Sequence, residues 1–307
     1  MDDTLIGEAV VKLPDVLHTF VDDHGLLFCT KSDIHAYAHG QRQPVGRFSD
    51  YRPRVVPCGF HADADAVYVA YPHRVLVYDR TAMHYLRDVC KITDLTADAN
   101  RQYCGLTGDR VSRRLFVASR VLTSGTLCVE VWEHDGPLER VVHLAVSILN
   151  GAHTHMCADA ASRSIYLWDG RGRVCVLCIT TCAVKACIDV HDAFTPPMGA
   201  ATLCVVGKAL LVAPVGGQKI IAFDTATRVR TAECALDQTN RVAANLAAHG
   251  DYAYAVDTEH DVVKAYLSPM KSLTKHLTAN PGVLYALSNG VSNSPVVAIV
   301  IQYVCAW

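Results

Sequence analysis

The sequence lacks a strong charge of either sign. Its 28 lysines and arginines are nearly balanced by 30 aspartates and glutamates, giving a formal net charge of -2 at pH 7 and an isoelectric point near 6.7. This balance provides no whole-chain attraction to nucleic acid or to an anionic membrane, although it is compatible with a local charged patch. DNA is therefore not an expected partner, and any partner must be recognised by local features.

A secretion signal and a membrane-spanning segment are also missing from the pattern. The opening residues MDDTLIGEAVVKLPDV carry two acids where a secretory signal carries bases. The apolar run PVVAIVIQYVCAW at 295–307 contains about a dozen apolar residues, against the ~20 that a spanning helix needs. The 13 cysteines lie mostly inside apolar runs, as buried free thiols do in a reducing compartment. We expect an intracellular protein, cytoplasmic or nuclear, without membrane insertion.

A long helical stripe is absent, and short strand-like runs take its place. Runs of four to eight residues rich in Val, Ile, Tyr, Phe and Leu are separated by Gly, Asp, Pro, Ser and Asn throughout the chain. One run of the type "small apolar, Tyr or Leu or Phe, apolar, Ala" recurs seven times, 41 to 50 residues apart. The seven runs are GLLFC (25–29), AVYVA (66–70), RLFVA (114–118), SIYLW (164–168), ALLVA (209–213), YAYAV (252–256) and VVAIV (296–300).

Each recurring run has a similar run before it and another after it, and six of the seven units end in a fourth, more polar run. Four antiparallel strands per repeat of this length are typical of a β-propeller blade. The sequence thus predicts an all-β, seven-bladed β-propeller that forms one domain over residues 1–307. The expected blades are 16–48, 55–93, 102–147, 152–192, 199–237, 242–278, and 282–307 together with 4–13. The N-terminal strand LIGEAVVKL is expected to complete the last blade, so that no strand edge is left unpaired.

The period and strand order resemble those of WD-repeat and related seven-bladed propellers. The family's Trp-Asp pair ends a third strand, and that place holds Tyr78-Asp79, Trp132-Glu133 and Phe223-Asp224 in three of the units. Trp168-Asp169 lies at the end of a second strand, out of phase, and the family's Gly-His pair is absent. Asp79 and Asp224 also fit a local role, in which the carboxylate accepts backbone N–H groups of a turn. The resemblance implies a ring closed by an N-terminal strand and a scaffolding role.

The best candidate for a metal site is His153, His155 and Cys157, which alternate along a predicted first strand and so share one face. Alternation also suits a packed face between blades, and no other unit repeats these residues, so no metal and no cofactor are expected. Cys175 and Cys178 form a C-x-x-C whose odd spacing directs them to opposite faces of a strand. Cys178, Cys182 and Cys187 straddle a turn and could approach each other, but four well-placed thiolates are not evident.

The expected strand order sorts the loops onto two rims. Connections that enter a first strand or join second to third strands share one rim, which we call the Arg rim. Its candidate partner-binding residues are Tyr51, Arg52, Arg54, Tyr71, His73, Arg101, Arg120, Arg171, Arg173 and Arg241. The opposite rim holds Asp22, Asp23, Asp63, Asp65, Asp109, Asp159 and Asp251, with Arg110, Arg113 and Arg114. Arginine and tyrosine together are what protein interfaces favour, although solvated loops are also simply polar.

These observations predict a non-enzymatic scaffold for protein–protein interaction, a subunit of a larger intracellular assembly. Its Arg rim would bind a protein partner, an acidic peptide segment among the options. One alternative is a propeller enzyme with a metal or acid/base site at the channel mouth, using His153, His155 and Cys157. Another is an RNA-binding propeller that clamps its ligand with the Arg rim, Arg171 and Arg173 included. Fold alone does not choose among them.

Overall fold

The structure is a computed structural model, and it describes part of the chain. The described residues are 4–5, 8–12, 16–30, 33–38, 44–48, 56–91, 100–134, 136–147, 154–190, 200–215, 217, 219–236, 242–249, 252–257 and 262–267. The chain divides into two units, residues 1–266 and residues 267–307. The blade predicted at 282–307 lies outside the described residues, so the single-domain prediction for residues 1–307 stays a prediction.

Four sheets are each built from four consecutive strands in an antiparallel meander. The first contains β3 (Val16–Asp22), β4 (Gly25–Thr30), β5 (Ile34–Tyr37) and β6 (Gly46–Arg47). The second contains β7 (Gly59–Ala62), β8 (Ala66–Tyr71), β9 (Arg74–Asp79) and β10 (Tyr85–Lys91). The third contains β11 (Arg101–Asp109), β12 (Arg114–Val121), β13 (Thr126–Glu133) and β14 (Leu138–Ser147). The fourth contains β15 (Met156–Asp159), β16 (Ser164–Trp168), β17 (Arg173–Cys178) and β18 (Val184–Asp189).

Two further sheets recruit the N-terminal strands. The fifth contains β19 (Ala201–Val206), β20 (Ala209–Pro214), β21 (Lys219–Asp224) and β22 (Arg230–Leu236), with β1 (Thr4–Leu5) parallel to β22 at its edge. The sixth contains β23 (Val242–His249), β24 (Tyr252–Asp257) and β25 (Val262–Leu267), with β2 (Glu8–Lys12) antiparallel to β25. Five sheets therefore have four strands and one has five, which confirms the four-stranded antiparallel blade.

The predicted count of seven blades is wrong for the described residues, which form six sheets. The partner predicted for the N-terminal strand is also wrong. Strand β2 pairs with β25, the third strand of the sixth unit, in the register Ala9↔Lys264 and Val11↔Val263. The physical reason is that an unpaired strand edge recruits any strand of suitable length and pattern, so the pattern of residues 5–13 did not identify which edge it would meet.

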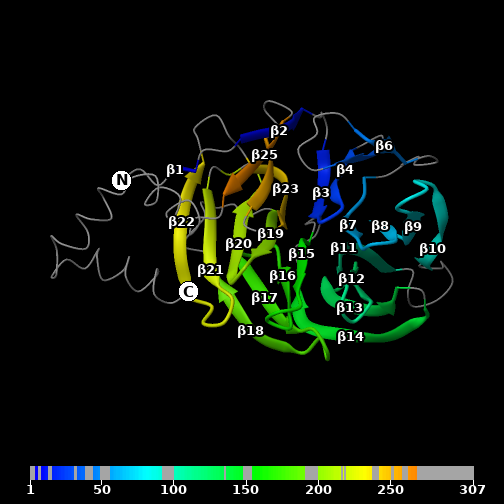
Figure 1. Ribbon diagram of the computed structural model, residues 1–307. Coiled ribbons are helices and arrows are strands. Elements are labelled where there is room, and N and C mark those ends of the chain that lie inside the picture. Colours follow the sequence, from blue (N-terminus) through cyan, green and yellow to red (C-terminus); the bar gives the residue numbers. More distant parts are fainter. Residues whose placement is uncertain are drawn as a thin grey trace, which may run out of the picture. The chain divides into compact units, whose positions relative to one another are not determined.

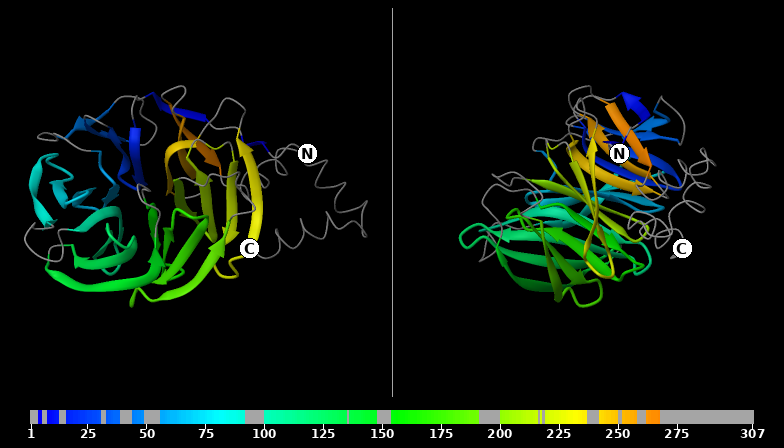
Figure 2. Two further views of the ribbon diagram at one scale, coloured as in Figure 1. Left: turned by 180° about the vertical axis from the view of Figure 1, so that it is seen from behind. Right: turned by 90° about the vertical axis from the view of Figure 1, so that its left-hand side faces the viewer.

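The six sheets follow one another around a central axis (Figures 1 and 2). Their innermost strands are β3, β7, β11, β15, β19 and β23, and each contacts the next in this order. Strand β23 contacts β3 in turn, which brings the sixth sheet beside the first. This arrangement is an all-β propeller, as the repeat predicted.

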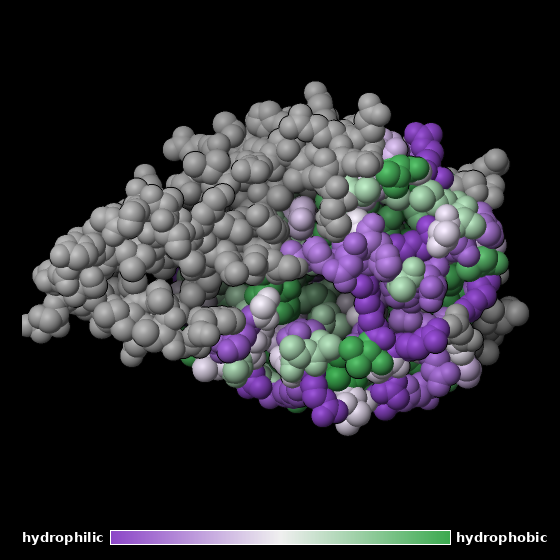
Figure 3. Space-filling model, viewed as in Figure 1, coloured by the Kyte–Doolittle hydropathy of each residue, from purple (hydrophilic) through white to green (hydrophobic). Residues whose placement is uncertain are grey.

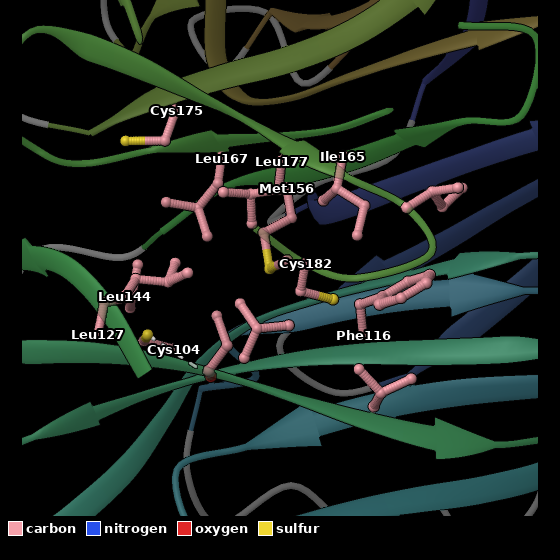
Figure 4. Close-up of a cluster of buried hydrophobic side chains, with 14 residues drawn as sticks. Cys104, Phe116, Leu127, Leu144, Met156, Ile165, Leu167, Cys175, Leu177 and Cys182 are labelled. Carbon is pink, nitrogen blue, oxygen red and sulfur yellow. Dashed lines mark hydrogen bonds between the residues drawn. The ribbon is translucent and has the colours of Figure 1, made fainter. Parts of the chain in front are cut away.

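The hydrophobic core lies between neighbouring sheets because successive side chains of a strand point to opposite faces. Strand β16 shows this alternation. Ile165 and Leu167 pack with residues of the third sheet such as Phe116 (Figure 4), whereas Tyr166 and Trp168 pack with residues of the fifth. Every residue of β16 is consequently buried, and each sheet has two hydrophobic faces, one for each neighbour.

Glycines allow the innermost strands to come close together. A Cβ atom on Gly59 of β7 would lie 2.5 Å from the backbone nitrogen of Leu106 in β11. A Cβ atom on Gly105 of β11 would lie 2.5 Å from the carbonyl oxygen of Thr154, just before β15. Both distances are too short for a real side chain, so glycine is required where the second, third and fourth sheets meet near the axis.

Candidate functional site

A cavity of about 170 Å³ lies on the axis, lined by residues of all six innermost strands and the segments just before them. This volume is large enough for several water molecules. The wall includes histidines, threonines and cysteines as well as apolar side chains, among them His18, His61, Thr154, His155 and Cys157. The cavity is therefore a mixed polar and apolar site at the centre of the propeller.

Several polar side chains of the wall hold neighbouring blades together. The Nε2 atom of His18 lies 3.1 Å from the carbonyl oxygen of Pro57, which links the first blade to the second. The N–H of Ala158 donates to the Thr107 hydroxyl at 3.1 Å, linking the third blade to the fourth. The Leu246 N–H likewise donates to the Thr202 hydroxyl, between the fifth and sixth blades. These groups satisfy backbone donors and acceptors that the sheets themselves leave unpaired.

The predicted metal ligands are engaged elsewhere or lie outside the described residues. His153 is not among the described residues. The Nδ1 atom of His155 accepts the N–H of Leu203 at 3.0 Å, which places the ring proton of a neutral imidazole on Nε2. Burial raises the pKa of the Cys157 thiol well above its ordinary value, which disfavours the thiolate that binds metals. Within the described ranges, no group of three or more His, Cys, Asp or Glu side chains could hold a metal ion.

Three buried polar atoms of the cavity wall have no hydrogen-bond partner among the described residues. They are the hydroxyl oxygens of Thr19 and Thr154 and the Nε2 atom of His61. Buried polar atoms without partners are costly, and ordered water is their usual partner.

His61 lies in the wall between charged and aromatic neighbours. Its ring stacks on Tyr68, with 6.2 Å between centroids, and meets Phe20 edge-on at 5.3 Å. Burial, with smaller contributions from His134 and Arg110, lowers the pKa of His61 to about 3. The folded protein thus keeps this imidazole neutral at any pH near neutrality.

We expect the His61→Gln variant to lose part of the acid sensitivity of the protein. Because the unfolded chain protonates His61 near its ordinary pKa while the folded chain does not, stability is retained above that pKa and falls with decreasing pH. The loss is about 1.4 kcal/mol per pH unit below about pH 6.5. Urea unfolding at about pH 6 and pH 5 should therefore show a shallower pH slope in His61→Gln than in wild type. The exposed His84 provides the control, His84→Gln; equal slopes in wild type and His61→Gln would contradict this assignment.

Beside the cavity, a buried charge network joins the first three blades. The guanidinium of Arg80 donates to both carboxylate oxygens of Asp22, at 2.7 and 2.8 Å. Arg110 of the third blade also donates to Asp22. Burial would raise the pKa of Asp22, but the hydrogen bonds from Arg80 and Arg110 outweigh it and lower the pKa to about 2. One carboxylate of the first blade therefore binds one arginine from each of the next two.

Asp63 follows the first strand of the second blade, just as Asp22 ends the first strand of the first blade. Its carboxylate lies 2.8 Å from Nδ1 of His134 in the third blade and accepts the hydroxyl of Tyr68 at 3.2 Å. It also accepts the backbone N–H groups of Asp65 and Ala66. Burial opposes ionisation of Asp63, but the hydrogen bonds, with His134 first, hold its pKa well below its ordinary value. At the rim formed by the turns that follow the first strands, ionised carboxylates thus hold neighbouring blades together.

Sequence reasoning placed these aspartates on the correct rim but did not predict the network. Asp recurs at the end of the first strand in four units, and this recurrence is the signal that could have predicted part of the charge network. Asp22, Asp63, Asp109 and Asp159 each accept backbone N–H groups of the following turn. Asp79 and Asp224 act in the same way between third and fourth strands, which confirms their predicted turn role. The partner arginines come from other blades, and no spacing in the sequence indicates them.

Three of the six described members of the predicted Arg rim make internal contacts. Arg101 pairs with the buried Glu130 at 2.6 Å and donates to the Ser119 hydroxyl at 2.7 Å. Arg120 is buried and donates to the Gln102 side chain at 3.4 Å. Arg173 donates through Nε to the fully buried Asp169 at 2.9 Å and keeps part of its side chain exposed. These arginines stabilise the blades that carry them.

The other members of the Arg rim differ in exposure. Tyr71 is buried, with the Arg74 guanidinium 6.0 Å from its ring centre. His73 and Arg171 are exposed. The remaining four lie outside the described residues: Tyr51, Arg52, Arg54 and Arg241. Partner binding by the Arg rim stays a prediction, with His73, Arg171 and part of Arg173 as its accessible described members.

The opposite rim carries most of the exposed large apolar side chains. We call it the hairpin rim, because it consists of the turns that join first to second and third to fourth strands. Among the described residues, seven of the nine exposed large apolar side chains lie in these turns or in the first two residues of the fourth strands that follow them: Val45, Tyr85, Leu86, Val111, Leu138, Val184 and Val229. The other two, Val56 and Val215, lie on the Arg rim. On the face shown in Figure 3, hydrophobic residues lie scattered among hydrophilic ones.

No helix in the described ranges has the length and hydropathy needed to cross a membrane. No protein-family model matches the chain, and no curated protein matches it.

The chain is similar in structure to many solved proteins. A luciferin-regenerating enzyme is 14% identical, with a TM-score of 0.60 over 85% of this chain and 94% of that one. A chain of a mitotic checkpoint complex is 10% identical, with a TM-score of 0.57 over 86% and 92%. Hydrazine synthase of Kuenenia stuttgartiensis is 12% identical, with a TM-score of 0.56 over 83% and 96%. Because two of these are enzymes and one belongs to a protein complex, the likeness establishes the propeller fold alone.

Proposed function

We propose that the protein is a non-enzymatic scaffold that binds an acidic segment of a partner protein through its hairpin rim. The observation that carries the proposal is the placement of its exposed apolar side chains. Val111 and Val229 are the two most exposed of them, at 83% and 61%. Each stands between exposed arginines, Val111 between Arg110 and Arg113 and Val229 between Arg228 and Arg230.

Exposed valine beside arginine is a combination that interfaces use. Apolar side chains favour burial against a partner, and arginine is enriched at interface cores because its planar guanidinium pairs with carboxylates. The nearby acids Asp109 and Asp224 are occupied by the N–H groups of their own turns. Arg110 also pairs with Asp22 and Arg230 with Glu233. Because a guanidinium has several N–H donors, the exposed parts of these groups can in addition bind carboxylates of a partner. An intracellular location, in the cytoplasm or nucleus, is part of the proposal and rests on the cysteine content.

We expect the Val111→Glu and Val229→Glu variants to lose the partner while keeping the fold. Both side chains are exposed, so each variant should unfold within about 0.5 kcal/mol of wild type. In the complex, the new carboxylate would meet an acidic partner and lack a counter-charge, which should weaken binding by tenfold or more, a change of about 1.4 kcal/mol. The measurement is quantitative affinity purification of tagged variants from the native cell, followed by titration of the recovered partner.

Val215→Glu is the matched control, because Val215 is also an exposed valine, at 43%, but lies on the Arg rim. It should retain the partner. If Val215→Glu or Arg171→Ala abolished binding while the Val111 and Val229 variants retained it, the Arg rim would be the binding face and the hairpin rim would be excluded. If all variants bound equally, both rims would be excluded. The RNA-binding and enzyme alternatives remain predictions that no finding tests.

A further inference from the structure

The outer hairpin of the fourth blade carries two cysteines directly opposite each other. Cys175 in β17 and Cys187 in β18 are register partners across this antiparallel pair. Their sulfur atoms are 3.9 Å apart, and they are not joined. The C-x-x-C pattern pointed to Cys175 with Cys178, but Cys178 pairs in register with Ser164 of β16. The fold thus brings together two cysteines that are twelve residues apart.

The ladder position of this pair suits a disulfide bond. The N–H of Val190 donates to the carbonyl oxygen of Gly172 at 2.9 Å, so that opposing pair is a hydrogen-bonded one. Hydrogen-bonded and non-hydrogen-bonded pairs alternate along an antiparallel ladder, and the register is regular from Arg173 to Val176. Cys175 and Cys187 therefore occupy a non-hydrogen-bonded site, where Cα atoms are about 4.5 Å apart, inside the range that disulfides span. Side-chain rotation alone can close the bond.

The two thiols differ in accessibility. Cys175 is fully buried, and its burial, together with the neighbouring Cys187, raises its pKa to about 12. In Figure 4 its sulfur points away from Leu167, Leu177 and Ile165 of the cluster to which it belongs. Cys187 is exposed on the outermost strand. A reagent in solution can reach Cys187 first, and Cys175 only through it.

We infer that Cys175 and Cys187 form a dithiol modification site that a small disulfide such as oxidised glutathione converts to an intrachain disulfide. The Cys187 thiolate attacks one sulfur of oxidised glutathione and releases one glutathione thiolate, leaving a mixed disulfide. Cys175 then gives its proton to solvent, attacks the Cys187 sulfur and releases the second glutathione. Two protein thiols are oxidised, and one glutathione disulfide is reduced to two thiols.

Cys178 is the competing thiol. Hydrogen bonds with the Thr181 hydroxyl and N–H lower its pKa to about 7, so it ionises more readily than Cys175. It lies three residues from Cys175 along the strand and therefore on the opposite face. It can form a mixed disulfide with glutathione, but it does not face Cys187. The test must distinguish these two products.

The experiment is oxidation of the full-length protein with oxidised glutathione, followed by tryptic digestion without reduction and tandem mass spectrometry. Cys175 lies in the peptide 174–185 and Cys187 in the peptide 186–208. We expect these peptides to be joined between Cys175 and Cys187, about 2 Da lighter than their sum and without glutathione on either cysteine. Dithiothreitol should separate them again.

Three variants sharpen the test. Cys175→Ser should hold a stable glutathione on Cys187, at least tenfold more than wild type, because no second thiol displaces it. Cys187→Ser should leave Cys175 unmodified, and Cys178→Ser should form the bridge as wild type does. A lasting glutathione on Cys187 of the wild type, or a bridge that uses Cys178 or Cys182 in place of Cys175, would overturn the inference. The wild-type digest decides this even if a variant fails to fold.

Discussion

Arg80→Ala is expected to lower the free energy of unfolding by about 3–5 kcal/mol, the range for removing one partner of a buried ion pair. Arg80 and Asp22 are 8% and 3% exposed, and Arg80 also donates to the carbonyl oxygen of Asp63 at 2.5 Å. Without the guanidinium, the Asp22 carboxylate stays buried beside Arg110. Urea unfolding at neutral pH measures the loss.

The acid dependence gives a second readout of the same pair. Because the pKa of Asp22 in the folded protein is below its ordinary value, its stabilisation is complete above about pH 4 and is lost as the pH falls toward about 2. Arg80→Ala should reduce this acid-dependent loss, whereas Arg171→Ala, which removes an exposed side chain, should match wild type within about 0.5 kcal/mol. An Arg80→Ala protein as stable as wild type would show that the first two blades do not depend on this pair.

Deletion of residues 1–13 is expected to have the second large effect. It removes β2 and exposes the hydrogen-bonding edge of β25, as well as removing β1 from β22. Loss of about four backbone hydrogen bonds, each worth about 1 kcal/mol net, predicts destabilisation by about 4 kcal/mol. The exposed edge should also promote aggregation. Thermal unfolding and light scattering measure the two consequences.

A designed disulfide tests the pairing partner independently of stability. Ala9 and Lys264 are register partners, so Ala9→Cys with Lys264→Cys should cross-link under mild oxidation. Ala9→Cys with Gln302→Cys tests the pairing predicted from the sequence, in which the strand 5–13 joins the run QYVCAW that begins at Gln302. If only the second combination cross-links, or if the deletion protein melts like wild type, the assignment of β2 to the sixth sheet is wrong.

The repeat in the sequence was sufficient to predict the blade and its strands. Recurring runs such as Ala66–Ala70 and Ser164–Trp168 are apolar at nearly every position, and they became second strands that are buried on both faces. The pairing of the N-terminal strand was not predictable, because it depends on which edge lacks a partner in space. The turn roles of Asp79 and Asp224 followed from local chemistry, and both were confirmed.

The candidate sites were harder to predict because side-chain partners come from different blades. The sequence predicts that Arg101 is a loop arginine available to a partner. In the structure, the buried Glu130, two strands away, accepts its hydrogen bond. His155 reads as a metal ligand, but it accepts a backbone N–H from the next blade. In each case the deciding neighbour is 29 or 48 residues distant along the chain. Sequence spacing carries no information about such contacts.

The pairing of β2 with β25 also has a consequence for biosynthesis. Val11 and Val263 are register partners, and at translation rates of about 5–20 residues per second the second follows the first by about 13–50 s. During that interval the first-made strand has no partner, while the blades between them can form in order. A contact of such long sequence separation forms late and slowly. Strand β2 leaves the ribosome well before its partner and is therefore among the last of the described strands to pair, so its apolar residues are ones that a chaperone would have to protect.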